Sequence, residues 1–198
     1  MSGQTPSQTV GPFFHLGLVR PGQTDLVSEG TRGQRIVVCG QVRDGAGAPV
    51  PDAMLEIWQA DANGIYAHPA DPRRGEADPS FAGFGRAATD EQGRYRFRTV
   101  RPGPVPGDGG TLQAPHVNFR VFARGMLIHA TTRIYFPGEP ANRDDPALAA
   151  ISDPRRRGTL IASEEEGEDL PCYRFDVVLQ GDEETVFFDF QALSSSAP

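Results

Sequence analysis

Short β-rich runs separated by turn signals constrain what this chain can fold into. Turns are frequent, since 23 Gly and 18 Pro occur in 198 residues, and a single stretch, residues 145–157, has a helical pattern. Short runs without alternating helices favour antiparallel pairing over a parallel α/β sheet. We therefore predict an all-β fold, an antiparallel β-sandwich with long ordered loops and one short helix. The β-rich runs span residues 36–42, 53–59, 94–100, 116–123, 127–136, 159–161, 173–180 and 185–190.

The chain divides into an extended N-terminal arm, residues 1–34, and a sandwich domain, residues 35–198. The arm shows little periodicity and bends at the Gly-Pro pair 11–12. Its apolar side chains, among them Phe13 and Phe14, are poorly suited to a tail that stays in water. We therefore expect the arm to pack on a partner chain.

Composition limits the partners and the compartment. A formal net charge of −7 argues against nucleic acid, whose phosphates attract basic proteins. Cys39 and Cys172 lie far apart in the sequence and match no disulfide framework or zinc-binding spacing, so we expect buried free thiols. The N-terminus lacks the pattern of a signal peptide, and no apolar run reaches membrane-spanning length. We expect a soluble cytoplasmic protein.

Residues 100–122 join a Pro- and Gly-rich loop to an alternating strand. The three prolines of the loop exclude a helix and leave few backbone donors for a central strand. The strand places His116 and Asn118 on one face, because side chains alternate with period two. Two histidines at this spacing would suit a metal ion, whereas the amide of Asn118 is a poor ligand for a transition metal. The pattern indicates a metal site that lacks a donor.

A long motif begins with residues 38–66, which read as a strand, a Gly-rich hairpin, a second strand and an Asn-Gly turn before Tyr66. Its residues and their continuation are Gly40, Val42, Gly47, Val50, Leu55-Glu56-Ile57, Gly64, Tyr66, Phe84-Gly85-Arg86, Thr89-Asp90, Phe97-Arg98-Thr99, Pro102-Gly103, Pro115-His116 and Tyr173-Arg174-Phe175-Asp176. This pattern resembles the signature of the intradiol ring-cleavage dioxygenases and covers nearly the whole chain beyond the arm. The resemblance implies oxidative cleavage of an aromatic ring between two hydroxyl-bearing carbons.

In the iron-bearing members of that family, two tyrosines and two histidines hold Fe(III). The matching positions here are Tyr66, Val105, His116 and Asn118, so two of the four donors are missing. One phenol and one imidazole cannot supply the ligand sphere that Fe(III) requires. We therefore expect a degenerate iron site that holds no metal, and no catalytic residue in this chain by itself.

Further segments resemble the non-iron chain of those family members that are built from two related chains. They are residues 5–13, 58–64, 122–125 and 184–190. The resemblance implies a hetero-oligomer with an iron-bearing partner chain, whose Fe(III) catalyses the cleavage of protocatechuate by O2 to 3-carboxy-cis,cis-muconate. In such a complex the cofactor belongs to the partner and not to this chain.

The same resemblance implies substrate-binding residues at the shared active site, namely Thr9, Gly11 and Pro12 of the arm together with Arg124. Arg124 stands at a predicted hairpin turn, where a guanidinium group can bind a carboxylate with two parallel hydrogen bonds. Three other arginines are alternative candidates for that contact: Arg98, Arg101 and Arg133.

Two other interpretations stay open at this point. The first is a catalytically silent β-sandwich that binds a small aromatic molecule or another protein. The second is an iron enzyme that uses substitute ligands such as His68 or His129. Co-purification with an iron-bearing paralogue would separate the first from the two-chain enzyme, and metal analysis of the purified chain would test the second.

Overall fold

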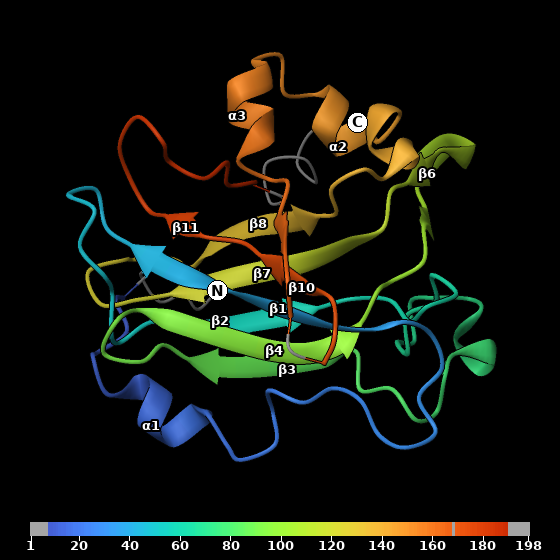
Figure 1. The fold of residues 1–198 in the computed structure, drawn as a ribbon, viewed down its shortest axis with the longest axis horizontal. Coiled ribbons are helices and arrows are strands. Elements are labelled where there is room, and N and C mark those ends of the chain that lie inside the picture. Colours follow the sequence, from blue (N-terminus) through green and yellow to red (C-terminus); the bar gives the residue numbers. More distant parts are fainter. Residues whose placement is uncertain (1–7, 168, 190–198) are drawn as a thin grey trace, which may run out of the picture.

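Two β-sheets pack face to face in a sandwich, with short helices at its edges (Figure 1). This computed structural model describes residues 8–167 and 169–189; residues 1–7 of the arm and residue 190 of the last predicted strand lie outside the described residues. The larger sheet contains β1 (Arg35–Arg43), β4 (Arg94–Val100), β9 (Ser163–Glu165), β10 (Cys172–Arg174) and β11 (Val177–Val178). The smaller sheet contains β2 (Met54–Trp58), β3 (Phe84–Ala88), β7 (His116–Phe122) and β8 (Ala130–Tyr135), and a ribbon pairs β5 (Val105–Pro106) with β6 (Leu112–Gln113).

The predicted antiparallel sandwich is confirmed, but two pairings of the larger sheet are parallel. β1 pairs antiparallel with β4 along one edge and parallel with both β10 and β11 along the other. The predicted single strand 173–180 is in fact two strands, β10 and β11, because the chain bends at Phe175–Asp176. There the Asp176 carboxylate accepts the Gln41 N–H at 3.0 Å in place of a strand carbonyl. Gly40 faces the Phe175 carbonyl so closely that a side chain would collide with it.

The core lies between the sheets and follows the period-two pattern of the strands. In β4, the side chains of Tyr95 and Phe97 point inward and are buried, whereas Arg94 and Arg96 point outward. Phe97 and Phe119 of β7 belong to one continuous apolar cluster between the two sheets, and the ring of Tyr95 lies near both. Burial of such a side chain contributes about 1.5–3 kcal/mol, so the cluster fixes how the sheets face one another.

The described residues include more helical segments than the one that the sequence predicts. Residues 145–157 form two helices, α2 (Pro146–Ala149) and α3 (Pro154–Gly158). Each follows an aspartate N-cap and begins at a proline, which has no N–H and is well suited to the first position of a helix. The first helix ends at Ala149, so residues 150–153 separate the two. The other segments are α1 (Phe14–Leu18) and the 3-10 turns η1 (Arg74–Glu76), η2 (Asp108–Gly110) and η3 (Pro140–Arg143). No helix in the described part of the chain could span a lipid bilayer.

Two predicted strands near the C-terminus are wrong. Residues 159–161 contribute an isolated bridge between Ile161 and Tyr135, and residues 185–189 form no strand. The latter segment is held against the smaller sheet instead, because Thr132 Oγ1 donates to the Val186 carbonyl at 2.7 Å. Phe187 and its neighbours are partly buried against the body of the same chain.

The arm packs partly on its own chain. Leu26 is 2% exposed and belongs to the main core, and the segment around it bridges to Arg98 and Phe81. Phe13 and Leu16, at the start of the arm, are 73% and 70% exposed. That the arm packs on a partner chain stays a prediction, and it now concerns the first half of the arm.

Candidate active-site residues

A tight turn presents Tyr66 to the proline-rich loop. Asp61 organises the turn, since its Oδ1 accepts the N–H groups of Asn63 and Ile65 at 2.8 and 3.0 Å. Gly64 has a positive φ of 74°, and a side chain there would collide with the Pro104 carbonyl. The turn and the loop are therefore fixed against each other, which brings Tyr66 near the start of β7.

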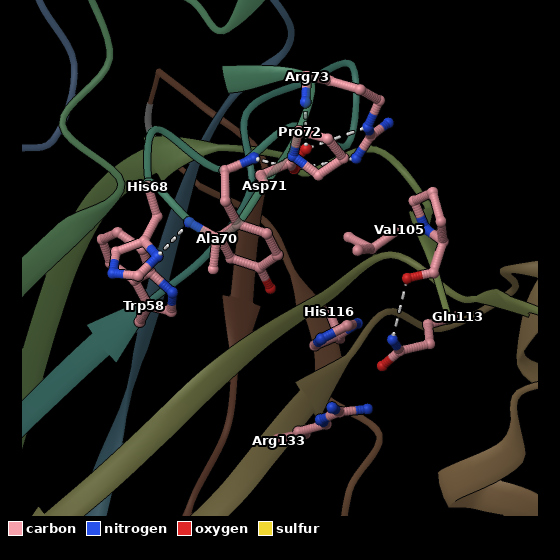
Figure 2. A pocket seen from close by; sticks show the side chains of 12 residues that line it. Trp58, His68, Ala70, Asp71, Pro72, Arg73, Val105, Gln113, His116 and Arg133 are labelled. Atoms are coloured by element: carbon pink, nitrogen blue, oxygen red, sulfur yellow. Dashed lines mark hydrogen bonds and ion pairs between the residues drawn. The ribbon is translucent and has the colours of Figure 1, made fainter. Parts of the chain in front are cut away.

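The four predicted iron-site positions come together. Tyr66, Val105 and His116 line a cavity of about 570 Å³, and Asn118 Nδ2 donates to the Tyr66 hydroxyl at 3.1 Å. Figure 2 shows the Val105 side chain above His116, and Arg133 on the neighbouring strand below it. His116 is 2% exposed, and its Nδ1 donates to the Ala114 carbonyl at 2.7 Å. The four positions matched to the iron ligands of the family therefore lie together in the folded chain.

An arginine contributes positive charge to this cluster. Arg133 is the cross-strand partner of Asn118, and its Nε donates to Asn118 Oδ1 at 3.2 Å. Its Nη1 donates to the Tyr135 hydroxyl at 3.4 Å, which in turn donates to Asp145 Oδ1 at 3.0 Å. The amide of Asn118 is therefore engaged on both sides, by Arg133 and by the Tyr66 hydroxyl.

The electrostatics of the cluster do not suit Fe(III). Burial raises the pKa of Tyr66, against the opposing hydrogen bond from Asn118 and the charge of Arg133, so the phenol stays protonated. Burial, and next the charge of Arg133, lowers the pKa of His116 to about 4. Val105 offers no donor atom, and a fixed guanidinium repels a trivalent cation. The residues present do not fit a ferric ion.

The proposed substitute ligands have other roles. His68 is exposed, accepts the Ala70 N–H at its Nδ1 at 3.1 Å and meets Trp58 edge to face. His129 stacks on Phe122 with ring centroids 5.2 Å apart. Among the described residues, neither histidine belongs to a group of three or more His, Cys, Asp or Glu side chains placed to hold a metal ion.

A second cluster joins the arm to the loop between β7 and β8. The Gly125 N–H donates to Thr9 Oγ1 at 2.9 Å, across 116 positions of sequence. Arg124 lies next to this bond, and its Nε is 3.2 Å from Oδ2 of Asp52. The structure thus places Thr9 and Arg124, two predicted substrate-binding residues, side by side. Whether they bind substrate stays a prediction.

Gly11 and Pro12 lie on the same arm and form the turn that leads into α1, with the Phe14 N–H donating to the Gly11 carbonyl at 3.3 Å. A side chain at Gly11 would meet no atom of the described chain.

The other predicted arginines have partners within the chain. Arg98 pairs with Asp25 at 3.1 Å, and Arg101 pairs with Glu139 at 3.0 Å. Arg101 also lies over the Phe136 ring, 4.6 Å from its centroid. Both belong to the larger sheet or follow it, so the structure does not bring them to the cluster of Thr9 and Arg124.

Sequence reasoning missed Asp52. Its carboxylate is buried, at 7% exposure for the residue, and the ion pair with Arg124 lacks hydrogen-bond geometry, so neither oxygen has a hydrogen bond within the described chain. The sequence around Asp52 gave little indication of this burial, because a Pro-Asp pair before a strand normally indicates an exposed turn.

Comparisons with known proteins agree with this fold and this cluster of residues. A family model described as a dioxygenase matches residues 10–181. The chain belongs to the intradiol ring-cleaving dioxygenases. Like other members of this oxidoreductase family, it has the antiparallel sandwich fold. A solved structure, the dioxygenase domain of a dioxygenase and carbohydrate-binding protein fusion from Streptomyces sp. SirexAA-E, aligns with a TM-score of 0.61 and 30% identity, over 93% of this chain and 100% of that one.

Two sequence relatives are informative about the branch of the intradiol dioxygenases. The chain is 43% identical over 199 residues to the protocatechuate 3,4-dioxygenase alpha chain of Pseudomonas putida, covering 94% of this chain and 96% of that one. It is 39% identical over 159 residues to the protocatechuate 3,4-dioxygenase beta chain of Burkholderia cepacia, covering 77% and 67%. Intradiol dioxygenases depend on iron, and these relatives show alpha and beta as separate chains.

Proposed function

We propose that this chain is the alpha-type subunit of a protocatechuate 3,4-dioxygenase, which assembles with an iron-bearing beta-type chain and completes its active site. One observation carries the proposal: the four positions that would hold iron lie together but present a valine, an amide, a protonated phenol and a neutral imidazole beside the guanidinium of Arg133. The identity to alpha chains over 94% of the sequence supports it. The Fe(III) then belongs to the partner.

The reaction inserts both atoms of O2 between the two hydroxyl-bearing ring carbons of protocatechuate, and the product is 3-carboxy-cis,cis-muconate. The contribution of this chain is to bind and orient the substrate. Arg124 supplies a positive charge for the ring carboxylate, because its Nε faces Asp52 while its side chain is 62% exposed. Since the chain carries a net charge of −7, a local cation is needed to attract a dianionic substrate.

The arm has a second role in this proposal. Thr9 fixes the arm to the turn that carries Arg124, and the Gly11-Pro12 bend lies two residues further along. Here the backbone approaches the partner's site and excludes water from the bound substrate, which strengthens the charge interactions within it.

Exposed apolar side chains support a large interface at the same end. Phe13 and Leu16 of the arm and Leu127 and Ile128 of the β7–β8 loop are between 65% and 73% exposed. Residues of both segments line one shallow pocket. Exposed apolar side chains gathered in this way usually mark a protein interface.

The test is expression of the full-length chain alone and together with its iron-bearing paralogue. We expect the two chains to co-purify, with iron stoichiometric to the paralogue and turnover of protocatechuate by the complex. Stoichiometric, tightly held iron in this chain purified alone would refute the assignment. A colourless chain that never associates with such a partner would instead favour the silent binding module.

A further inference from the structure

A pair of cysteines lies on the outer face of the larger sheet, on the opposite side of that sheet from the core. Cys39 belongs to the central strand β1 and Cys172 to the neighbouring strand β10, 133 positions later. Their Sγ atoms are 3.0 Å apart. The neighbouring residues Val38 and Tyr173 point into the core, so both sulfur atoms face away from it.

A carboxylate completes a group of three. Glu165 of β9 is the direct cross-strand partner of Cys172, which places both side chains on the same face of the sheet. The two sulfur atoms and a carboxylate oxygen all lie within 4.8 Å of one another. No other group of three His, Cys, Asp or Glu side chains converges in this way within residues 8–167 and 169–189.

The chemistry of these donors selects the ion. Thiolate sulfur prefers soft or borderline cations, and zinc-group ions accept two sulfurs and one oxygen with a fourth position open to water. Two thiolates on one tetrahedral zinc ion lie about 3.8 Å apart, given Zn–S bonds of about 2.3 Å. Cys39 and Cys172 need to separate by less than ~1 Å to reach that distance.

The surroundings allow an ion to enter and tolerate the charge. Cys172 is buried, but Cys39 is partly exposed and Glu165 is exposed, so the three donors are open to solvent on one side. Arg174 is bound mainly to Asp176, at 2.9 Å, and forms a second, longer ion pair with Glu165 at 3.8 Å. Both side chains of this longer pair are partly exposed, so it is weak, and a divalent cation held by two thiolates can take its place at Glu165.

We propose that Cys39, Cys172 and Glu165 form a binding site for a zinc-group divalent cation, separate from the degenerate iron site. Binding releases the two thiol protons and joins three strands through one ion. β9 is a three-residue strand that is exposed throughout, so the ion would fasten this edge strand to β1. This inference does not depend on the proposed dioxygenase function.

The experiment is a Cd²⁺ titration of the full-length chain, followed by the ultraviolet charge-transfer absorption of cadmium bound to thiolate. The chain has two cysteines, so the difference between wild type and Cys39→Ser gives the contribution of this pair. We expect one cadmium ion per chain, lost in Cys39→Ser and displaced by excess Zn²⁺. Glu165→Gln should weaken binding by at least about ten-fold.

Glu164→Gln is the matched control, because Glu164 pairs with Tyr173 and projects from the other face of β9. It should bind cadmium as the wild type does. A wild-type protein without the absorption, or one equally affected by both glutamate substitutions, would overturn the site. A thiol assay that finds the pair already oxidised before any reductant is added would show a disulfide instead.

Discussion

Arg124 and Asp52 form an ion pair of unequal partners: the carboxylate is 10% exposed at its side chain and the guanidinium is 62% exposed, with 3.2 Å between Nε and Oδ2. The buried anion has no hydrogen bond within the described chain. Its interaction with Arg124 uses the inner nitrogen, which orients the outer part of the guanidinium toward solvent. Asp52 thus holds the inner end of the Arg124 guanidinium in place, and the outer end is accessible to a ligand.

Replacement of Arg124 by alanine should therefore raise KM for protocatechuate more than for plain catechol, which lacks the ring carboxylate. A charge-assisted hydrogen bond contributes roughly 1.5–3 kcal/mol, so a change of about ten-fold or more is expected for protocatechuate. Steady-state kinetics of the assembled enzyme measures both values. Arg94→Ala, an exposed position at the start of β4, is the control and should change neither. Equal effects on the two substrates would make Arg124 structural.

Asp52→Asn should raise KM for protocatechuate by roughly two- to five-fold, the scale of a partly exposed ion pair. The substitution removes the charge that orients Arg124 but keeps the shape of the side chain. In an Arg124→Ala background the same change should have no further effect on KM, because the group it positions is gone. An additive double variant would show that Asp52 acts through something else.

Deletion of residues 1–13 should leave iron in the partner and its absorption intact, while turnover of protocatechuate falls. The reason is that the arm is fixed beside Arg124 by the Thr9 contact. Thr9→Val, which removes the acceptor of the Gly125 N–H, should give a smaller loss in the same direction. A truncated complex that assembles and works at the full-length rate would reduce the arm to a tether.

The imidazole of His116 should make stability depend on pH. Burial and Arg133 lower its pKa from 6.5 to about 4, so the unfolded chain binds a proton that the folded chain excludes. The free energy of unfolding is therefore unaffected by His116 above pH 6.5. It decreases as the pH falls from 6.5 toward 4, by about 3 kcal/mol at most. Thermal unfolding of the complex should show a shallower decline over this range in His116→Asn, whereas exposed His68→Asn should keep the wild-type decline.

Restoring the missing donors should not by itself restore iron binding. In Val105→Tyr with Asn118→His, four donors are present, but Arg133 remains the neighbour of position 118 and repels the cation. Addition of Arg133→Gln should increase ferric iron uptake by at least about ten-fold, the equivalent of 1.4 kcal/mol, with tyrosinate-to-iron colour. Iron analysis of both variants measures this, and equal uptake would remove Arg133 from the explanation.

The positions of the degenerate iron site could be predicted because they depend on local rules. Period-two alternation puts His116 and Asn118 on one face of β7, and the Asn-Gly turn before Tyr66 needs the positive φ found at Gly64. The sandwich itself follows from the same alternation in β1, β4 and β7.

The neighbour of Asn118 could not be predicted, because it depends on strand register. A two-residue turn at Arg124-Gly125 would pair Asn118 with Thr131. The loop is longer, and the actual register pairs Asn118 with Arg133. A shift of two residues keeps every side chain on its face but changes which residues meet, so alternation carries no information on this contact.

Contacts between distant parts of the chain could not be predicted from the sequence either. The bond between Thr9 and Gly125 and the approach of Cys39 to Cys172 each span more than 100 positions. The division of the predicted run 173–180 into β10 and β11 comes from a bend at Asp176, a residue whose side chain replaces a backbone acceptor. Such contacts follow from the assembled fold and not from any local pattern.

The place of β1 has a consequence for how the protein is made. One edge of β1 can pair with β4 once residue 100 has emerged from the ribosome, but the other edge waits for β10 and β11, which begin at residues 172 and 177. Until then a nascent chain presents an unpaired edge to its neighbours. Completion of the larger sheet is thus a late event of synthesis, and contacts so distant in sequence form slowly. Until β10 and β11 have been made, newly synthesised molecules are therefore exposed to aggregation through the open edge of β1.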